Sequence, residues 1–315
     1  MAALMYQIFS SSALMSLGLY HLTCTIRNYL RSPRDYISRP YHPFPPSSSS
    51  LSSSNSTTYL KYLQLYLLMI CLAIAFVHQT LISSDSDPLL KGSTPVHRFT
   101  SLQSAAVIFL FLIVSLALLL SDFTSFLPFP SHDLFFALAS ALFFLQYSVS
   151  SASASVQKSD LQAKCDSVSA RISALSSVLS LLLACQPRLF IADVSLGASI
   201  CLQALWVLQT GLSLYVEAFI PEGCHRLLDV VSGVEGSTQC DLDDSRLRAI
   251  AILDLVFVLH VMFVVLLVLL VYAILAKTVG GGGGGGMRKF GSYEALPTSA
   301  DTNHVQMKTF TGTQA

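Results

Sequence analysis

Charged residues are scarce in this chain of 315 residues, and their scarcity excludes several classes of protein. Asp, Glu, Lys and Arg together make up 11% of the residues, whereas 53% are hydrophobic, and the formal net charge is zero. A protein that binds nucleic acid needs a basic face that neutralises phosphates, and no such cluster of Lys and Arg occurs here. The composition instead favours the membrane class of proteins, with the lipid bilayer as the first expected partner.

Motifs of catalysis and metal binding are missing as well. No GxSxG, HExxH or Walker sequence occurs, and the seven cysteines form no CxxC or Cys/His spacing. We therefore expect no catalytic residues, no metal site and no cofactor. Haem is also disfavoured, because His21 and His78 are expected near opposite membrane surfaces and could not ligate one iron together.

Long hydrophobic segments, in contrast, are abundant. A helix needs about 20 apolar residues to cross a bilayer, and seven segments are roughly this long. Because only closed helices or barrels satisfy their backbone groups inside lipid, we expect an all-α bundle of seven transmembrane helices within residues 1–277. The expected spans are residues 4–26, 59–82, 102–121, 131–151, 168–186, 190–216 and 249–276.

Basic residues indicate how this bundle is oriented. Arg27, Arg31 and Arg34 follow the first hydrophobic segment, and positive charge near helix ends tends to stay in the cytosol. We expect the N-terminus outside or in a lumen and the C-terminus in the cytosol, in the plasma membrane or an endomembrane. The sequence Asn-Ser-Thr at 55–57 would then be cytosolic, so a glycan on Asn55 would invert this topology.

The end of the chain has the composition of a flexible tail. Residues 280–286 are seven consecutive glycines, which is typical of a mobile linker, and we expect residues 278–315 to form a cytosolic tail. Tyr293 and Leu296 lie three residues apart in this tail. That pattern is typical of sorting signals in which a tyrosine and a bulky apolar residue fill two pockets of a clathrin adaptor.

Two cysteines differ from the others in their surroundings. Cys224 and Cys240 lie in the longest polar loop between hydrophobic segments. They can form a disulfide if that loop faces an oxidising compartment, or they can remain free. The sequence leaves both alternatives open.

A row of polar residues, the polar stripe, follows the sixth hydrophobic segment. Its members recur every three or four residues and therefore share one helical face: Ser195, Ser199, Gln203, Trp206, Thr210, Ser213 and Glu217. They could line the path of a solute, or they could join neighbouring helices by hydrogen bonds. The second interpretation is favoured because only Glu217 is charged and it ends the span. Near the start of this segment, Asp193 is expected to form an ion pair with Arg188.

Residues 202–215, which read LQALWVLQTGLSLY, resemble the sixth-helix signature of the transmembrane protein 45 family, also catalogued as domain of unknown function 716. Further support comes from residues 18–21 (GLYH), Cys240, Arg248 and His260, and residues 217–225 (EAFIPEGCH) are similar to the plant branch. The resemblance implies a seven-helix membrane protein whose plant relatives are associated with responses to viruses and other pathogens. Many members carry several His and a Glu between the fourth and fifth helices. Residues 145–164 contain neither residue type here, so no metal or proton site is expected there.

These observations support one leading function and two alternatives. The leading hypothesis is a non-enzymatic membrane protein that acts through membrane-protein or clathrin-adaptor partners or through trafficking, with a role in plant defence. The first alternative is a transporter or channel whose path follows the polar stripe. A seven-helix receptor ranks last, because residues 122–130 form a short loop with little basic surface for a G protein.

The first prediction concerns the tail. Tyr293→Ala combined with Leu296→Ala should redistribute the protein between membranes, because an adaptor would lose both side chains that it binds. Fluorescence microscopy of the tagged full chain measures the distribution. Thr302→Ala with Val305→Ala is the matched control in the same tail. An identical distribution of the two double variants would remove the support for a sorting signal.

Overall fold

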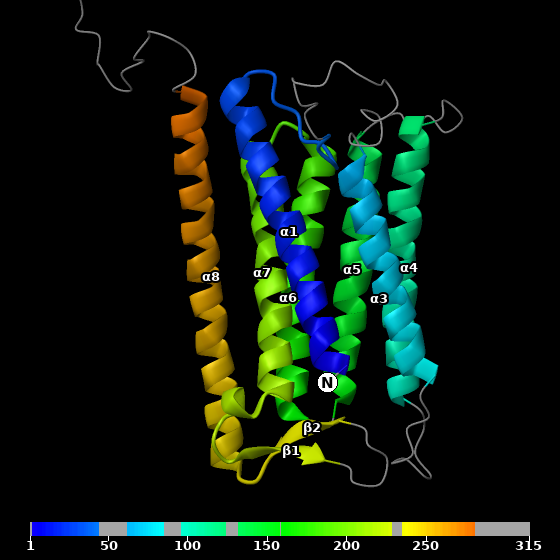
Figure 1. Ribbon diagram of the computed structural model, residues 1–315, viewed down its shortest axis with the longest axis vertical. Coiled ribbons are helices and arrows are strands. Elements are labelled where there is room, and N and C mark those ends of the chain that lie inside the picture. Colours follow the sequence, from blue (N-terminus) through cyan, green and yellow to red (C-terminus); the bar gives the residue numbers. More distant parts are fainter. Residues whose placement is uncertain are drawn as a thin grey trace, which may run out of the picture.

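The computed structural model describes residues 2–43, 62–84, 96–123, 132–157, 159–228 and 235–280. Within these ranges, seven long α-helices stand side by side in one bundle (Figure 1). Their bounds are α1 (Ala2–Arg31), α3 (Leu63–Ser84), α4 (Val96–Phe123), α5 (His132–Val156), α6 (Asp160–Cys185), α7 (Phe190–Tyr215) and α8 (Asp243–Gly280). The expected all-α bundle of seven helices is confirmed.

Six of these helices, α3 to α8, are long and apolar enough to cross a membrane, which indicates a multi-pass integral membrane protein. The exception is α1, in which polar residues such as His21 and Thr25 interrupt the apolar sequence. This helix nevertheless runs the length of the bundle beside α7 (Figure 1). Both of these polar residues are buried in the protein, which removes them from lipid.

Several helices extend beyond the expected spans, because polar turns continue a helix outside its apolar segment. The clearest case is α6, which begins at Asp160 rather than at residue 168. Ser159 caps this end, since its side-chain oxygen accepts a hydrogen bond from the backbone N–H of Gln162. In α7 the bounds differ from the expected span of 190–216 by a single residue at one end.

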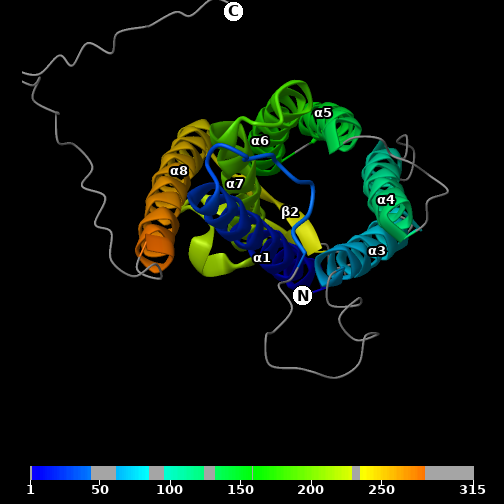
Figure 2. The same ribbon diagram turned by 90° about the horizontal axis from the view of Figure 1, so that it is seen from above.

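The main core lies where α1, α6, α7 and α8 meet. Trp206 of α7 is fully buried there, and its indole Nε1 donates to the carbonyl oxygen of Cys165 in α6 at 2.9 Å. Its ring also meets Phe257 of α8 edge to face, with the centroids 5.6 Å apart. Viewed from above, α3 and α4 form a separate pair beside α5 and α1 (Figure 2).

A short hairpin follows α7. The sequence predicts helices only, so this hairpin is not anticipated by it. After the 3-10 turn η2 (Glu217–Phe219), strands β1 (Cys224–Leu228) and β2 (Glu235–Cys240) pair antiparallel, with Cys224 opposite Cys240. A disulfide joins these two cysteines, so the structure contains the bonded alternative. The hairpin lies at the end of the bundle where α1 begins (Figure 1).

Two glycines bring α1 and α7 into close contact. A Cβ atom on Gly18 of α1 would lie 2.6 Å from the Sγ of Cys201 in α7. A Cβ atom on Gly197 would lie 2.9 Å from the Cγ of Leu22 and 3.1 Å from the Cδ2 of His21. Distances this short leave no room for a side chain, so backbone contact at these positions sets the separation of the two helices.

The second prediction tests this close contact. Gly18→Leu should destabilise the protein by roughly 1 to 3 kcal/mol, because the added side chain forces α1 away from Cys201. Ser16→Leu is the matched control, since it adds the same side chain on the exposed face of the same helix. Size-exclusion chromatography of detergent-purified protein after heating measures the loss of folded protein. Equal melting of the two variants would contradict the role assigned to Gly18.

Candidate functional site

A segment that we call the strap, residues 32–43, crosses the end of the bundle opposite the hairpin. It leaves the end of α1 and passes over the helices towards α3 (Figure 2). Its central side chains alternate, with Tyr36 and Ser38 buried and Ile37 and Arg39 exposed. The backbone N–H of Ser38 donates to the carbonyl oxygen of Pro187 at 2.8 Å, which attaches the strap to the turn between α6 and α7.

The strap covers a buried carboxylate. Asp193, in the first turn of α7, is fully buried. Its Oδ1 lies 2.7 Å from Nε2 of His21 in α1, and its Oδ2 accepts a hydrogen bond from the hydroxyl of Tyr36 in the strap. Both carboxylate oxygens are therefore bound by groups from two other segments, as a buried charge requires.

The end of the strap is held by His42. Its backbone N–H donates to Oε1 of Gln64 in α3 at 2.9 Å, and its carbonyl oxygen accepts from the Tyr20 hydroxyl at 3.0 Å. The ring nitrogens lie 3.4 Å from Oγ1 of Thr25 and 3.4 Å from Nδ2 of Asn28, both in α1. Together with Asp193, these contacts tie α1, α3 and α7 to one segment.

Aromatic rings enclose one side of the cluster formed by His21, Tyr36, His42 and Asp193. Phe190 stacks on Tyr29 with the ring centroids 3.8 Å apart, and it meets Tyr36 edge to face at 5.7 Å. The ring of Tyr36 is therefore fixed by packing as well as by its hydrogen bond to Asp193. This arrangement limits the access of water to the carboxylate.

Burial determines the protonation of the two titratable groups of the strap. Burial, followed by the electrostatic influence of the neighbouring His21 ring, lowers the pKa of His42 to about 3, so the His42 ring is neutral at neutral pH. Burial and the negative charge of Asp193 raise the pKa of Tyr36 above its ordinary value. Tyr36 therefore keeps its proton and donates it in the hydrogen bond to Asp193.

The cluster has two chemical capabilities. The rings of His21 and His42 lie 5.2 Å apart, centroid to centroid, beside one carboxylate, so the cluster brings two imidazoles and an acid together under the strap. It can also fasten the strap to the helices. Among the residues that the structure describes, no group of three or more His, Cys, Asp or Glu side chains is placed to hold a metal ion.

The middle of the polar stripe faces α6. Ser199 is buried with its Oγ 2.9 Å from Oγ of Ser176, and Nε2 of Gln203 donates to Oγ of Ser169 at 2.7 Å. With the indole bond of Trp206 described above, three members of the stripe hydrogen-bond to one neighbouring helix. This is the geometry of helix joining.

The remaining members of the stripe have other surroundings. Ser195 is half-buried, and Thr210 donates to the carbonyl oxygen of Trp206 at 2.9 Å within the same helix. Ser213 is buried and accepts from Nε2 of Gln209 at 2.9 Å. Glu217 is exposed in η2, beyond the end of α7. The stripe is therefore continuous in sequence, but only its middle faces α6.

The expected ion pair between Asp193 and Arg188 is wrong. Arg188 is exposed in the turn before α7, whereas Asp193 points inward to His21 and Tyr36. One signal for the correct partner was present in the sequence. Gly18 precedes His21 by three residues and Gly197 follows Asp193 by four, as expected where two antiparallel helices make close contact. Tyr36 belongs to a loop, for which no periodicity predicts a partner.

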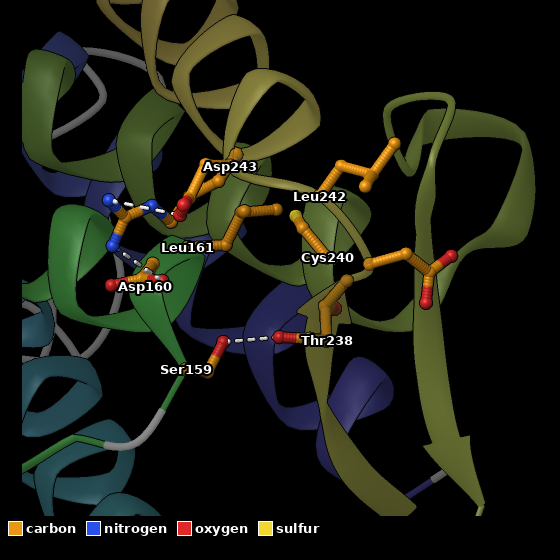
Figure 3. A pocket seen from close by; sticks show the side chains of 9 residues that line it. Ser159, Asp160, Leu161, Thr238, Cys240, Leu242 and Asp243 are labelled. Carbon is orange, nitrogen blue, oxygen red and sulfur yellow. Dashed lines mark hydrogen bonds and ion pairs between the residues drawn. The ribbon is translucent and has the colours of Figure 1, made fainter.

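A polar cavity of about 340 Å³ lies at the opposite end, between the starts of α6 and α8 and strand β2 (Figure 3). Arg246 lies 3.5 Å from carboxylate oxygens of both Asp160 and Asp243. Oγ of Ser159 donates to the carbonyl oxygen of Thr238 at 2.6 Å. The bond from Ser159 holds the hairpin against the start of α6, and Arg246 joins α8 to α6.

Three sequence predictions concern residues outside the described ranges. The sorting signal, Tyr293 and Leu296, and the sequon at Asn55 both lie there. The same holds for most of the predicted tail, residues 278–315.

The second half of the bundle matches a known protein family. Residues 132–273 match the family of unknown function DUF716. The match confirms the expected likeness to domain of unknown function 716 for α5 to α8. This DUF716 region contains Asp193, the polar stripe and both cysteines of the hairpin, whereas His21 and the strap precede it. A comparison with curated proteins found no match.

The third prediction is that acid loosens the strap. A buried His42 has a pKa of about 3, but in an open strap it regains its ordinary value of about 6.5. Its contribution to closure is complete above about pH 6.5 and is lost as the pH falls towards 3, because the open strap then binds the proton more strongly. Lowering the pH from about 7.5 to about 5 should speed alkylation of a Ser38→Cys variant about 30-fold, relative to exposed Cys185.

Peptide mass spectrometry of the detergent-purified chain measures both alkylation rates, so Cys185 corrects for the change in thiolate fraction. The control combines Ser38→Cys with His42→Gln, which keeps a polar side chain but cannot titrate. This control should show no acceleration. An equal acceleration with and without His42 would contradict the assignment.

Proposed function

We propose that this chain is a non-enzymatic integral membrane protein that serves as a scaffold for partners at the two ends of its bundle. The observation that carries the proposal is the full engagement of Asp193. Its two carboxylate oxygens bind His21 and Tyr36, so the buried charge joins the strap, α1 and α7. Each carboxylate oxygen of Asp193 is held by a group that fixes a helix or the strap, and this supports a structural use of the buried charge.

The hydrogen bonds between helices support the same function. Ser199, Gln203 and Trp206 each bond to α6, and Ser140 of α5 donates to the carbonyl oxygen of Ser177 in α6 at 2.9 Å. Interhelical bonds of this kind stabilise a membrane bundle by about 0.6 kcal/mol each. The polar groups of α5, α6 and α7 therefore favour a rigid scaffold.

We assign the strap to the cytosolic side and the hairpin to the exterior or a lumen. Arg31, Arg34 and Arg188 are exposed at the strap end, which agrees with the retention of positive charge in the cytosol. The disulfide between Cys224 and Cys240 belongs in an oxidising compartment. This orientation leaves the N-terminus outside and the tail, residues 278–315, available to clathrin adaptors.

The biological setting that we propose is the response of plants to viruses and other pathogens. The likeness of residues 217–225 to the plant branch of the transmembrane protein 45 family supports it. Partners that recognise pathogens would then bind at either end of the bundle. The chain itself would carry out no reaction.

Transport is the second candidate, and one observation favours it. Oε1 of Gln203 is buried, with no hydrogen-bond partner among the described residues. An unpartnered acceptor on the polar stripe could bind a passing solute. Uptake of a solute by vesicles that contain the purified chain, abolished by Gln203→Leu, would favour transport over the scaffold.

The fourth prediction tests the scaffold. Tyr36→Phe removes the hydrogen bond to Asp193 but keeps the aromatic contact with Phe190, so it should free the strap without emptying the core. Proximity labelling from a biotin ligase on the C-terminus should then lose at least half of the cytosolic neighbours. Labelling from a peroxidase on the N-terminus should be unchanged.

Tyr29→Phe is the matched control, since Tyr29 also packs on Phe190 but makes no hydrogen bond to Asp193. It should leave both sets of neighbours intact. If Tyr36→Phe also leaves both sets intact, the strap does not present a partner surface and the scaffold function fails.

A further inference from the structure

The outer surface of the strap end carries a group of arginines. The group, which we call the strap arginines, consists of Arg31, Arg34, Arg39 and Arg188, all of them exposed. None of these four makes an ion pair with another residue in the part of the chain that the structure describes. One acidic residue of the strap, Asp35, is set against these four arginines, so the surface that they form has a net positive charge.

The buried contacts of the strap bring two of these arginines, Arg39 and Arg188, together. The hydrogen bond from Ser38 to Pro187 joins two backbone segments, and the next residue in each segment is an arginine, Arg39 and Arg188. Tyr36 and Ser38 occupy the buried side of the strap. Ile37, which lies between them, and Arg39, which follows them, therefore face outward. The positive surface is therefore a fixed feature of the fold.

Three described basic residues near the hairpin differ, because each already has a carboxylate partner. Their ion pairs are Lys164 with Asp254 at 2.7 Å, Arg246 with Asp160 at 3.5 Å and Arg248 with Glu222 at 3.9 Å. The basic residues with ion pairs are therefore neutralised within the chain, whereas the strap arginines are not. They are available to an anionic group from outside the chain.

The position of the strap selects the kind of anion. The strap follows the end of α1 and lies against the turn before α7, which is the level of lipid headgroups for helices that cross the bilayer. Ile37 is 48% exposed between Arg34 and Arg39, so an apolar side chain accompanies the guanidinium groups at this level. Guanidinium forks bind the oxygens of phosphate and carboxylate groups in pairs, and phosphate is the anionic group that lipids present at this level.

We propose that the strap arginines bind the headgroup of a polyphosphorylated phospholipid in the adjacent leaflet. Four guanidinium groups exceed what one phosphodiester can neutralise, whereas a headgroup with additional phosphates offers several anionic groups at once. A zwitterionic headgroup has no net charge to complement this surface. The binding stands on the exposed arginines alone, so it does not require that the chain acts as a scaffold for proteins.

The fifth prediction uses the full chain, purified in detergent, and a water-soluble dioctanoyl phosphatidylinositol bisphosphate as the probe. Microscale thermophoresis should show saturable binding that weakens as salt is added. Arg34→Gln, Arg39→Gln and Arg188→Gln in one variant should weaken binding at least tenfold. The same three positions changed to Lys should recover part of the loss, because the charge returns without the paired hydrogen bonds.

The matched control carries Arg171→Gln, Arg246→Gln and Arg248→Gln, which remove the same charge towards the hairpin end. It should bind the probe as the unchanged chain does, and a heat-stability measurement on each variant checks folding. Dioctanoyl phosphatidylcholine should not bind, and inorganic phosphate should bind at least tenfold more weakly than the lipid. Equal loss in both triple variants, undiminished binding by the strap variant, or equal affinity for inorganic phosphate would each overturn the proposal.

Discussion

The buried carboxylate of Asp193 is the constraint on which the rest of the strap end depends. A charge in the low-dielectric interior is tolerated only with close partners, and loss of one partner from such a pair typically costs about 3 to 5 kcal/mol. Asp193 obtains its partners from two other segments, His21 and Tyr36. This requires that α1 lie against α7, which Gly18 and Gly197 permit, and that the chain fold back over the bundle after α1.

The two ends of the bundle are stabilised by different means. At the strap end, buried hydrogen bonds from Asp193 and His42 join the strap to α1, α3 and α7. At the hairpin end, a disulfide joins the two strands, and exposed ion pairs join α8 to α6 and to the segment before β1. Exposed ion pairs contribute little, so the disulfide is the stronger device there. The middle of the bundle depends on Trp206 and on the polar residues that link α7 to α6.

How much the sequence predicts differs from element to element, for physical reasons. Apolar length predicts helices well, and α7 (Phe190–Tyr215) agrees with residues 190–216 almost to the residue. The start of α6 is missed because its first turns are polar, and the hairpin is missed because its strands are short and polar. The cluster could be predicted only in part. His21 and Asp193 stand out as ionisable groups in hydrophobic segments, but their pairing depends on which helices become neighbours.

The separation of His21 and Asp193 along the chain has a consequence for biosynthesis. The two residues are 172 positions apart, and translation at about 5 to 20 residues per second needs roughly 10 to 30 seconds to cover that distance. During this interval the nascent α1 has no carboxylate to pair with its histidine. Retention of α1 beside the insertion machinery until α7 emerges would protect it, so delivery of the first helix to lipid is coupled to synthesis of the sixth.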